Sequence, residues 1–255
     1  MVAAGGCDVI EFLGEVAAWF ADPGTWSGRD GIPARLVEHL WISGVSLAAS
    51  VGVGLPLGLL IGHTGRGAAA VVAIANVGRA VPSLGLMGLA FILLLPLGLG
   101  VGPVPTIVAL TALGIPPIVV NAYVGLREVD RDLVEAARGM GMRERDVLRQ
   151  VEIPIALPVI LAGVRTSAVQ IVATATLAAA IGGGTLGQII YIGFNVGDQV
   201  RIFGAAVVVA ALSIATEIGF AALQRAGTSP GLRGRPYVPT EPAQVGREAG
   251  EPMNP

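Results

Sequence analysis

Long apolar segments separated by short polar ones make up most of this chain. The candidate membrane spans are the ranges 37–61, 68–99, 106–126, 155–181 and 202–223. Each range is long enough, at about 1.5 Å per residue, to cross about 30 Å of hydrocarbon. The pattern therefore predicts an all-α integral membrane protein with about five transmembrane helices.

The second apolar range is too long for one straight span and contains a proline. We expect a helix that enters the membrane, breaks near Pro82 and continues from Leu84 to Leu95. Arg79 precedes this break, and a guanidinium in hydrocarbon costs at least about 2.5 kcal/mol. We therefore expect Arg79 to lie near an interface or to face a wet protein interior.

Both ends of the chain depart from the apolar pattern. In residues 1–36, apolar side chains recur at helical spacing among acids, which predicts an extracytoplasmic or interfacial helix with Trp19 and Trp26 near the headgroups. A disordered extension is the alternative. Residues 225–255 are rich in Pro, Gly and charge, so we expect a disordered cytoplasmic tail. The transmembrane domain between them covers residues 37–224.

The composition agrees with a membrane protein and excludes several other classes. The chain is 53% hydrophobic and 13% charged, whereas about a quarter of the residues in soluble domains are charged. All 16 basic residues are arginine, so a phosphate-binding loop of the type G-x-x-x-x-G-K-S/T is excluded. The net charge of -2 argues against a nucleic-acid partner. With one cysteine and two histidines, we expect no catalytic residue, metal site or cofactor in this chain.

The positions of the arginines predict the orientation of the chain. With five spans, Arg66, the arginines of the 127–154 loop and those of the tail fall on one side, and the uncharged loop 97–105 falls on the other. Cytoplasmic loops carry an excess of basic residues. We therefore expect a multi-pass protein of the cell membrane, with the N-terminus outside and with the 127–154 loop and the C-terminus in the cytoplasm.

The 127–154 loop is the most charged internal segment and is expected to contain two helices around a glycine corner. Asp130 is a suitable N-cap for a short helix over residues 131–138. Gly139 and Gly141 then offer positions for a left-handed backbone turn. The corner therefore falls directly after the first helix.

The second helix of the loop is expected over residues 143–153, and Pro154 is expected to end it. The side chains that share an apolar face of the first helix are Leu133, Ala136, Ala137 and Met140. A loop that is small and apolar on one side and ionic on the other suits insertion into a groove of a partner. A merely solvated charged loop is the alternative.

The loop also carries a sequence motif. It consists of Glu135-Ala136-Ala137, Gly141 at the sixth position after the glutamate, and the ending Val151-x-Ile153-Pro154. This motif resembles the cytoplasmic EAA loop of binding-protein-dependent ABC importer permeases, whose pattern ends in Ile-x-Leu-Pro. The resemblance extends over about residues 37–223, and the stretches 75–84, 135–142, 155–160 and 178–187 resemble the osmoprotectant branch of this family.

The resemblance implies a type I ABC importer permease fold in which the first helix of the loop is a coupling helix. Glu135 would pair with a basic group on a cytoplasmic ABC ATPase dimer, which holds ATP and Mg. Ala136 and Ala137 would permit close approach to that partner, and Gly141 would form the corner.

Two further partners are implied by the resemblance: a second permease half, either a paralogue or another copy, and an extracytoplasmic substrate-binding protein. The implied cargo is glycine betaine, choline, carnitine or proline. The sequence contains no visible aromatic cage for a quaternary ammonium group, so initial recognition is expected on the binding protein.

Two alternatives to an osmoprotectant importer remain open. The same fold could import an amino acid or another small solute. An ion-coupled secondary transporter would instead need acids deep in the spans, and Glu217 is the candidate. A paired or interfacial role competes with proton coupling for Glu217, and Arg165 is expected to be paired near the inner leaflet.

Polar residues recur at every fourth position in the fourth predicted span, at Thr166, Gln170 and Thr174. This spacing puts them on one helix face. They are candidates for the lining of a translocation path, and hydrogen bonding between helices is the alternative. Asn121, in the third predicted span, is a candidate for an interhelical hydrogen bond, and a role in transport is the alternative. His63 stands alone in a predicted polar turn and is expected to be solvated.

The run Gly182-x-Gly184-x-x-Gly187 matches the letters of a dinucleotide-binding fingerprint. That function is rejected because the preceding apolar run is a predicted spanning helix and not a strand. A tight turn and a re-entrant loop that touches the binding protein are the two interpretations that remain.

Overall fold

The computed structural model of this chain describes residues 9–67, 69–71, 73–75 and 82–227. The α-helices are α1 (Val9–Ala21), α2 (Pro23–Trp26), α3 (Ile32–Thr64), α5 (Ser83–Leu94), α6 (Pro103–Arg127), α7 (Arg131–Gly139), α8 (Glu144–Val147), α9 (Ile153–Thr174), α10 (Gly187–Val196) and α11 (Gln199–Gly227). Two 3₁₀ segments, η1 (Leu95–Leu97) and η3 (Ala175–Ile181), and a π-helical turn, η2 (Leu148–Glu152), are also present, and residues 69–71 and 73–75 are helical.

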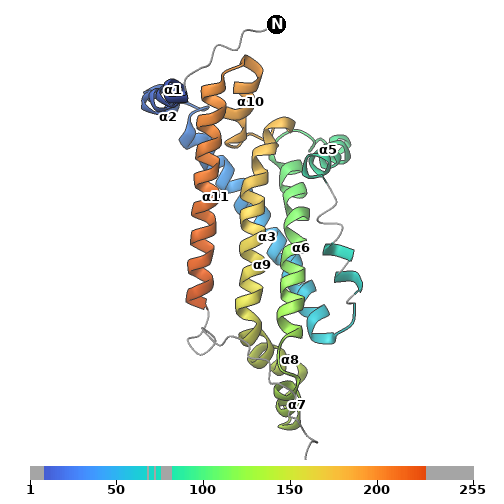
Figure 1. Cartoon of the computed structure of the whole chain (residues 1–255). Coiled ribbons are helices and arrows are strands. Elements are labelled where there is room, and N and C mark those ends of the chain that lie inside the picture. Colours follow the sequence, from blue (N-terminus) through green and yellow to red (C-terminus); the bar gives the residue numbers. More distant parts are fainter. Residues whose placement is uncertain (1–8, 68, 72, 76–81, 228–255) are drawn as a thin grey trace, which may run out of the picture.

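Four helices are long and apolar enough to cross a membrane, which confirms the predicted class. They are α3, α6, α11 and the continuous helix Glu144–Ile181. α6 packs against both α3 and α9, and α11 packs against α9. Figure 1 shows these helices running along the molecule, with α3 crossing obliquely behind α6 and α9.

The two ends of the bundle carry different elements. α7 and α8 lie at one end, whereas α1, α2 and α10 lie at the other (Figure 1). α3 ends at the α7 end, and α6 begins at the opposite end. The chain between Thr64 and Pro103 therefore leads from the α7 end to the opposite end. Part of this stretch lies outside the described residues, so a fifth passage through the membrane stays a prediction.

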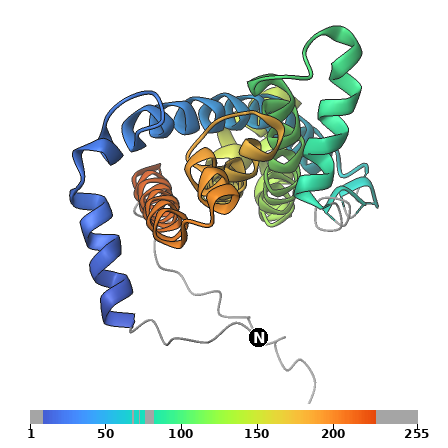
Figure 2. The same ribbon diagram turned by 90° about the horizontal axis from the view of Figure 1, so that it is seen from above.

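The second predicted span differs from the expectation. α5 does begin at Ser83, directly after Pro82. However, α5 lies across the end of the bundle, as the two perpendicular views in Figures 1 and 2 show. Its 12 residues span only about 18 Å, and Met87 packs in the core at that end. The predicted spanning continuation from Leu84 to Leu95 is therefore wrong.

Arg79 lies outside the described residues, so its environment stays a prediction.

The predicted domain limits are shifted at both ends. α3 already begins at Ile32, inside the segment assigned to residues 1–36. α11 continues to Gly227, so the first residues of the predicted tail are helical, and the remainder of that tail lies outside the described residues.

A stripe of small residues lets α3 approach α6 closely. The stripe repeats every four positions and consists of Ser46, Ser50, Gly54, Gly58 and Gly62, all buried. A Cβ atom added to Gly58 would lie 2.6 Å from Cβ of Ala122 on α6. Small residues of this kind replace hydrophobic association as the basis of helix packing in lipid.

The N-terminal helix α1 packs against α11. The rings of Phe12 and Phe203 meet edge to face with centroids 5.4 Å apart, and Trp19 covers Gly204. Figure 2 shows α1 lying across the end of the bundle. Trp26 is about half exposed, and the interfacial role of this segment stays a prediction.

Candidate coupling and translocation sites

The first helix of the 127–154 loop is anchored on one face and open on the other. Asp130 caps α7 as predicted, since its Oδ1 accepts a hydrogen bond from the amide of Asp132 at 2.9 Å. Val134 and Ala137 are buried in a core cluster with residues of α6 and α9. This cluster fixes α7 to the end of the bundle.

The open face of α7 differs from the predicted apolar face. Leu133 is 52% exposed and Met140 is 78% exposed, and Ala136 and Glu135 are exposed as well. Ala137, by contrast, points into the chain's own core. In this structure Ala137 therefore permits close approach to the permease's own helices, and Ala136 is the alanine available to a partner.

The glycine corner is formed by one of the two predicted glycines. Gly141 has a φ of +85°, in the left-handed region that favours glycine. Gly139 is the last residue of α7 and does not have a positive φ. Across this corner, Arg138 donates two hydrogen bonds of 2.9 Å to the carboxylate of Glu144. The paired carboxylate raises the pKa of the Arg138 guanidinium.

Pro154 does not end the second helix of the loop. The chain passes from α8 through the π-helical turn Leu148–Glu152 directly into α9, with Pro154 in the first turn of α9. A proline is tolerated in a first turn, and a π-helical turn changes the hydrogen-bond register ahead of it. The loop and the fourth span are consequently one continuous helix, Glu144–Ile181.

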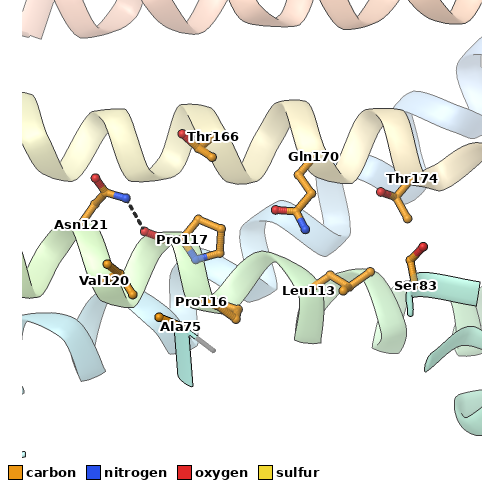
Figure 3. A pocket seen from close by; sticks show the side chains of 10 residues that line it. All are labelled: Ala75, Ser83, Leu113, Pro116, Pro117, Val120, Asn121, Thr166, Gln170 and Thr174. Carbon is orange, nitrogen blue, oxygen red and sulfur yellow. Dashed lines mark hydrogen bonds between the residues drawn. The ribbon is translucent and has the colours of Figure 1, made fainter. Parts of the chain in front are cut away.

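The polar stripe of α9 faces a cavity of about 530 Å³. Its lining consists of Ala75, Ser83, Leu113, Pro116, Pro117, Val120, Asn121, Thr166, Gln170 and Thr174, none of them charged. Figure 3 shows Gln170 and Thr174 reaching from α9 toward α6 and Ser83. The structure thus brings the three residues of the predicted stripe together on one cavity.

Hydrogen bonds of the cavity residues stay within single helices among the described residues. The Thr166 hydroxyl donates to the carbonyl of Ala162 at 3.0 Å. Asn121 Nδ2 donates to the carbonyl of Pro117 at 2.8 Å (Figure 3). The interhelical bond predicted for Asn121 is therefore wrong, because the amide bonds to a carbonyl one turn earlier in its own helix.

The glycine run at the opposite end forms a tight turn between η3 and α10. Gly182 and Gly184 adopt positive φ values of 74° and 73°. At Gly187, a Cβ atom would overlap the carbonyl oxygen of Thr176. The turn interpretation is thus confirmed, whereas contact of this loop with a binding protein stays a prediction.

Glu38 holds this turn from a distant part of the sequence. Its carboxylate accepts a hydrogen bond of 3.2 Å from the amide of Thr185 and one of 2.7 Å from Arg35. Thr185 itself has a φ of 71° and donates from its hydroxyl to the carbonyl of Ala175 at 2.9 Å. The sequence offered no signal for Glu38, since the contact joins residues 147 positions apart.

Two charged residues in the spans form a pair. Arg165 on α9 makes an ion pair with Glu217 on α11 and a hydrogen bond of 3.2 Å to Gln224. This agrees with the expected pairing of both residues. The acid that an ion-coupled transporter would need is therefore already engaged by an arginine.

His63 was predicted to be solvated in a loop, and the structure contradicts this prediction. It lies in the last turn of α3, and only 15% of its side chain is exposed. Its Nδ1 lies 2.5 Å from a carboxylate oxygen of Glu152 in the π-helical turn. The sequence missed this contact because the two residues are 89 positions apart.

Known proteins are similar to this chain in sequence and in fold. The chain is 42% identical over 201 residues to the glycine betaine/carnitine/choline transport system permease protein OpuCB of Bacillus subtilis, which covers 79% of this chain and 90% of that protein. It is 39% identical over 196 residues to the carnitine transport permease protein OpuCB of Listeria monocytogenes, over 77% of this chain and 88% of that protein.

A solved structure of the MetNI methionine ABC transporter in an inward-facing conformation has the same fold. The TM-score is 0.72 with 26% sequence identity, covering 82% of this chain and 99% of that one. Residues 54–226 match the family described as the inner membrane component of binding-protein-dependent transport systems. This chain therefore belongs to that family of inner membrane components, and its fold is that of a type I ABC importer permease.

Proposed function

We propose that this chain is the permease subunit of an ATP-driven importer of osmoprotectants such as glycine betaine, choline, carnitine or proline. It works with a second permease half, two cytoplasmic ABC ATPase subunits and an extracytoplasmic binding protein. The relatives from Bacillus subtilis and Listeria monocytogenes are permeases for glycine betaine, carnitine or choline, which supports this cargo class. ATP and Mg bind to the partner ATPase, and this chain supplies the path and the coupling contact.

The geometry of α7 is the observation that carries the proposal. Its inner face is buried through Val134 and Ala137, and its outer face exposes Leu133, Glu135 and Met140. Among the described residues, Glu135 makes no hydrogen bond or ion pair. A helix surface that exposes apolar side chains beside the carboxylates of Glu135 and Asp132, both unpaired in the described part of the chain, suits a groove that contains a basic side chain.

Movement of α7 reaches the spans through its buried face. The cluster beneath α7 contains Ala122 and Leu126 of α6 and Ala156 and Ile160 of α9. Packed clusters of this kind transmit displacement because protein interiors are close-packed. When the ATPase dimer closes, α7 therefore moves α6 and α9, which carry most of the lining of the cavity.

The cavity between α6 and α9 serves as part of the translocation path. Hydroxyl and amide groups line it at Thr166, Gln170, Thr174 and Asn121, and no charged side chain does so among the described residues. Such groups form hydrogen bonds with a small polar solute without the tight binding that an opposite charge would give. This suits passage of a zwitterion or a quaternary ammonium cation already selected by the binding protein.

The α7 end of the molecule faces the cytoplasm in this proposal, and the end with α1 and the glycine turn faces outward. Arg66, the arginines of the 127–154 loop and Arg225 support this orientation, because they all belong to segments at the α7 end. The turn at Gly182 and Gly184 is then available to the binding protein.

Charge reversal at Glu135 tests the coupling contact. Glu135→Arg is expected to weaken ATPase binding by at least about tenfold, because opposing like charges cost several kcal/mol at an interface. The measurement is recovery of the ATPase with the tagged permease after detergent extraction, titrated with ATPase. Membrane insertion should not change.

Glu128→Arg is the matched control, since Glu128 is equally exposed but lies at the end of α6, outside α7. It should retain the ATPase at the wild-type level. Equal ATPase recovery with wild type and Glu135→Arg would contradict the coupling role of Glu135.

A further inference from the structure

One partly buried hydrogen bond ties the first long helix to the 127–154 loop. Nδ1 of His63, in the last turn of α3, lies 2.5 Å from Oε2 of Glu152, and Nε2 of the same ring lies 3.3 Å from Oε2 of Glu144. The His63 ring thus contacts two acids, Glu144 at the start of α8 and Glu152 at the end of the π-helical turn.

The carboxylate of Glu152 depends on this histidine. Only 7% of the Glu152 side chain is exposed. A buried carboxylate is costly unless it is paired or hydrogen-bonded. Among the described residues, His63 is the side chain that makes a hydrogen bond or ion pair with Glu152.

The contact continues outward to α7. Glu144, the second acid at the His63 ring, accepts both hydrogen bonds from Arg138 of α7. A chain of side-chain contacts therefore runs from α3 through His63 and Glu144 to α7. Apart from this chain, α3 meets the cluster beneath α7 through the partly buried side chains of Leu55 and Leu59, and its Gly58 and Gly62 pack against Ala122 and Leu126 of that cluster.

We propose that His63 is a positioning residue for coupling: it holds the 127–154 loop against the end of α3, so that movement of α7 displaces α3 together with α6 and α9. This inference rests on the proposed function. It extends that function by adding the first long helix to the moving unit and by assigning a role to His63 and Glu152, which the EAA motif does not include.

Three variants distinguish the contacts of His63 with the two acids from general packing at the end of α3. His63→Ala removes both contacts. His63→Asn keeps a nitrogen donor near the position of Nδ1 and can still bond to Glu152. Thr64→Ala is the control, because the Thr64 hydroxyl bonds to the Leu60 carbonyl of its own helix.

Coupling is measured as solute imported per ATP hydrolysed by the complete importer in proteoliposomes. His63→Ala is expected to lower this ratio by at least about fivefold, the lower end of typical coupling effects. His63→Asn should recover most of the ratio, and Thr64→Ala should match wild type. A wild-type ratio in His63→Ala would overturn the inference.

Hydrogen exchange gives a readout that does not depend on transport. In the assembled complex without ATP, the α7 amides of His63→Ala should exchange faster than those of wild type. Those of His63→Asn, which keeps the bond to Glu152 and loses the contact with Glu144, should exchange at an intermediate rate. Should His63→Ala assemble poorly, Glu144→Ala breaks the exposed part of the chain and should also speed α7 exchange.

The two readouts distinguish the inference from the proposed function. Absence of ATP-driven import by the wild-type complex would contradict the proposed function. Unchanged α7 exchange in both His63→Ala and Glu144→Ala would overturn the positioning role of His63, whatever the complex transports.

Discussion

Single glycines set the distance between the first and third spans. Gly58 faces the backbone of Val119 and Cβ of Ala122, and an added Cβ would lie 2.8 Å from the Val119 carbonyl oxygen. Gly52, six positions earlier on the same helix, has open space at its Cβ position. A comparison of alanine substitutions at the two positions therefore distinguishes the effect of close helix contact from the effect of glycine on the helix backbone.

Gly58→Ala is expected to destabilise the permease by about 1–3 kcal/mol, because overpacking forces the helices apart. Gly52→Ala should be neutral or stabilising by up to about 1 kcal/mol, since alanine favours the helix. Thermal unfolding of the purified permease in detergent measures the difference. Equal unfolding temperatures for the two variants would contradict the role of Gly58 as a contact residue.

Local signals at single residues could be predicted, and contacts between distant residues could not. Asp130 caps a helix and Gly141 turns a corner through their own backbone neighbours, which the sequence displays. His63 and Glu38 have partners that only the fold brings near. The stripe of small residues in α3 lies between these cases, because its spacing of four was visible in the sequence.

Hydrophobic length predicted the long helices, while their ends depended on packing. Pro154 was expected to end a helix, but the π-helical turn before it lets α8 run into α9. α5 was expected to span, but Pro82 precedes a helix that lies across the bundle. The faces of α7 also differ from the prediction, because Ala137 is buried against the bundle whereas Leu133 and Met140 are exposed.

Single cysteines can report which elements meet water and on which side. The background variant is Cys7→Ser. In this background, Val101→Cys should react in intact cells with a membrane-impermeant thiol reagent, whereas Met140→Cys should react only after the membrane is opened. Both positions are at least 75% exposed. Gln170→Cys, on the cavity, should react with a small water-soluble reagent.

The control for the cavity is Ala168→Cys, a position 2% exposed on the same helix, which should stay unmodified. Labelling of Met140→Cys in intact cells would contradict the proposed orientation. Equal labelling of Gln170→Cys and Ala168→Cys would contradict the assignment of the cavity to the translocation path.

At the scale of the whole molecule, one continuous helix joins the three functional regions. The helix Glu144–Ile181 begins in the loop that carries α7, passes the cavity with the polar stripe, and ends at the glycine turn. A displacement at the α7 end can therefore reach the cavity and the opposite end of the molecule without crossing a hinge loop.

The central claim is that this chain imports an osmoprotectant only when a partner ATPase drives it. The most direct measurement is uptake of radiolabelled glycine betaine or choline into proteoliposomes that contain this permease with its cognate ATPase and binding protein. The account predicts uptake that requires ATP, the ATPase and the binding protein, and that Glu135→Arg lowers. Uptake that persists without the ATPase, or that an ion gradient alone sustains, would contradict it.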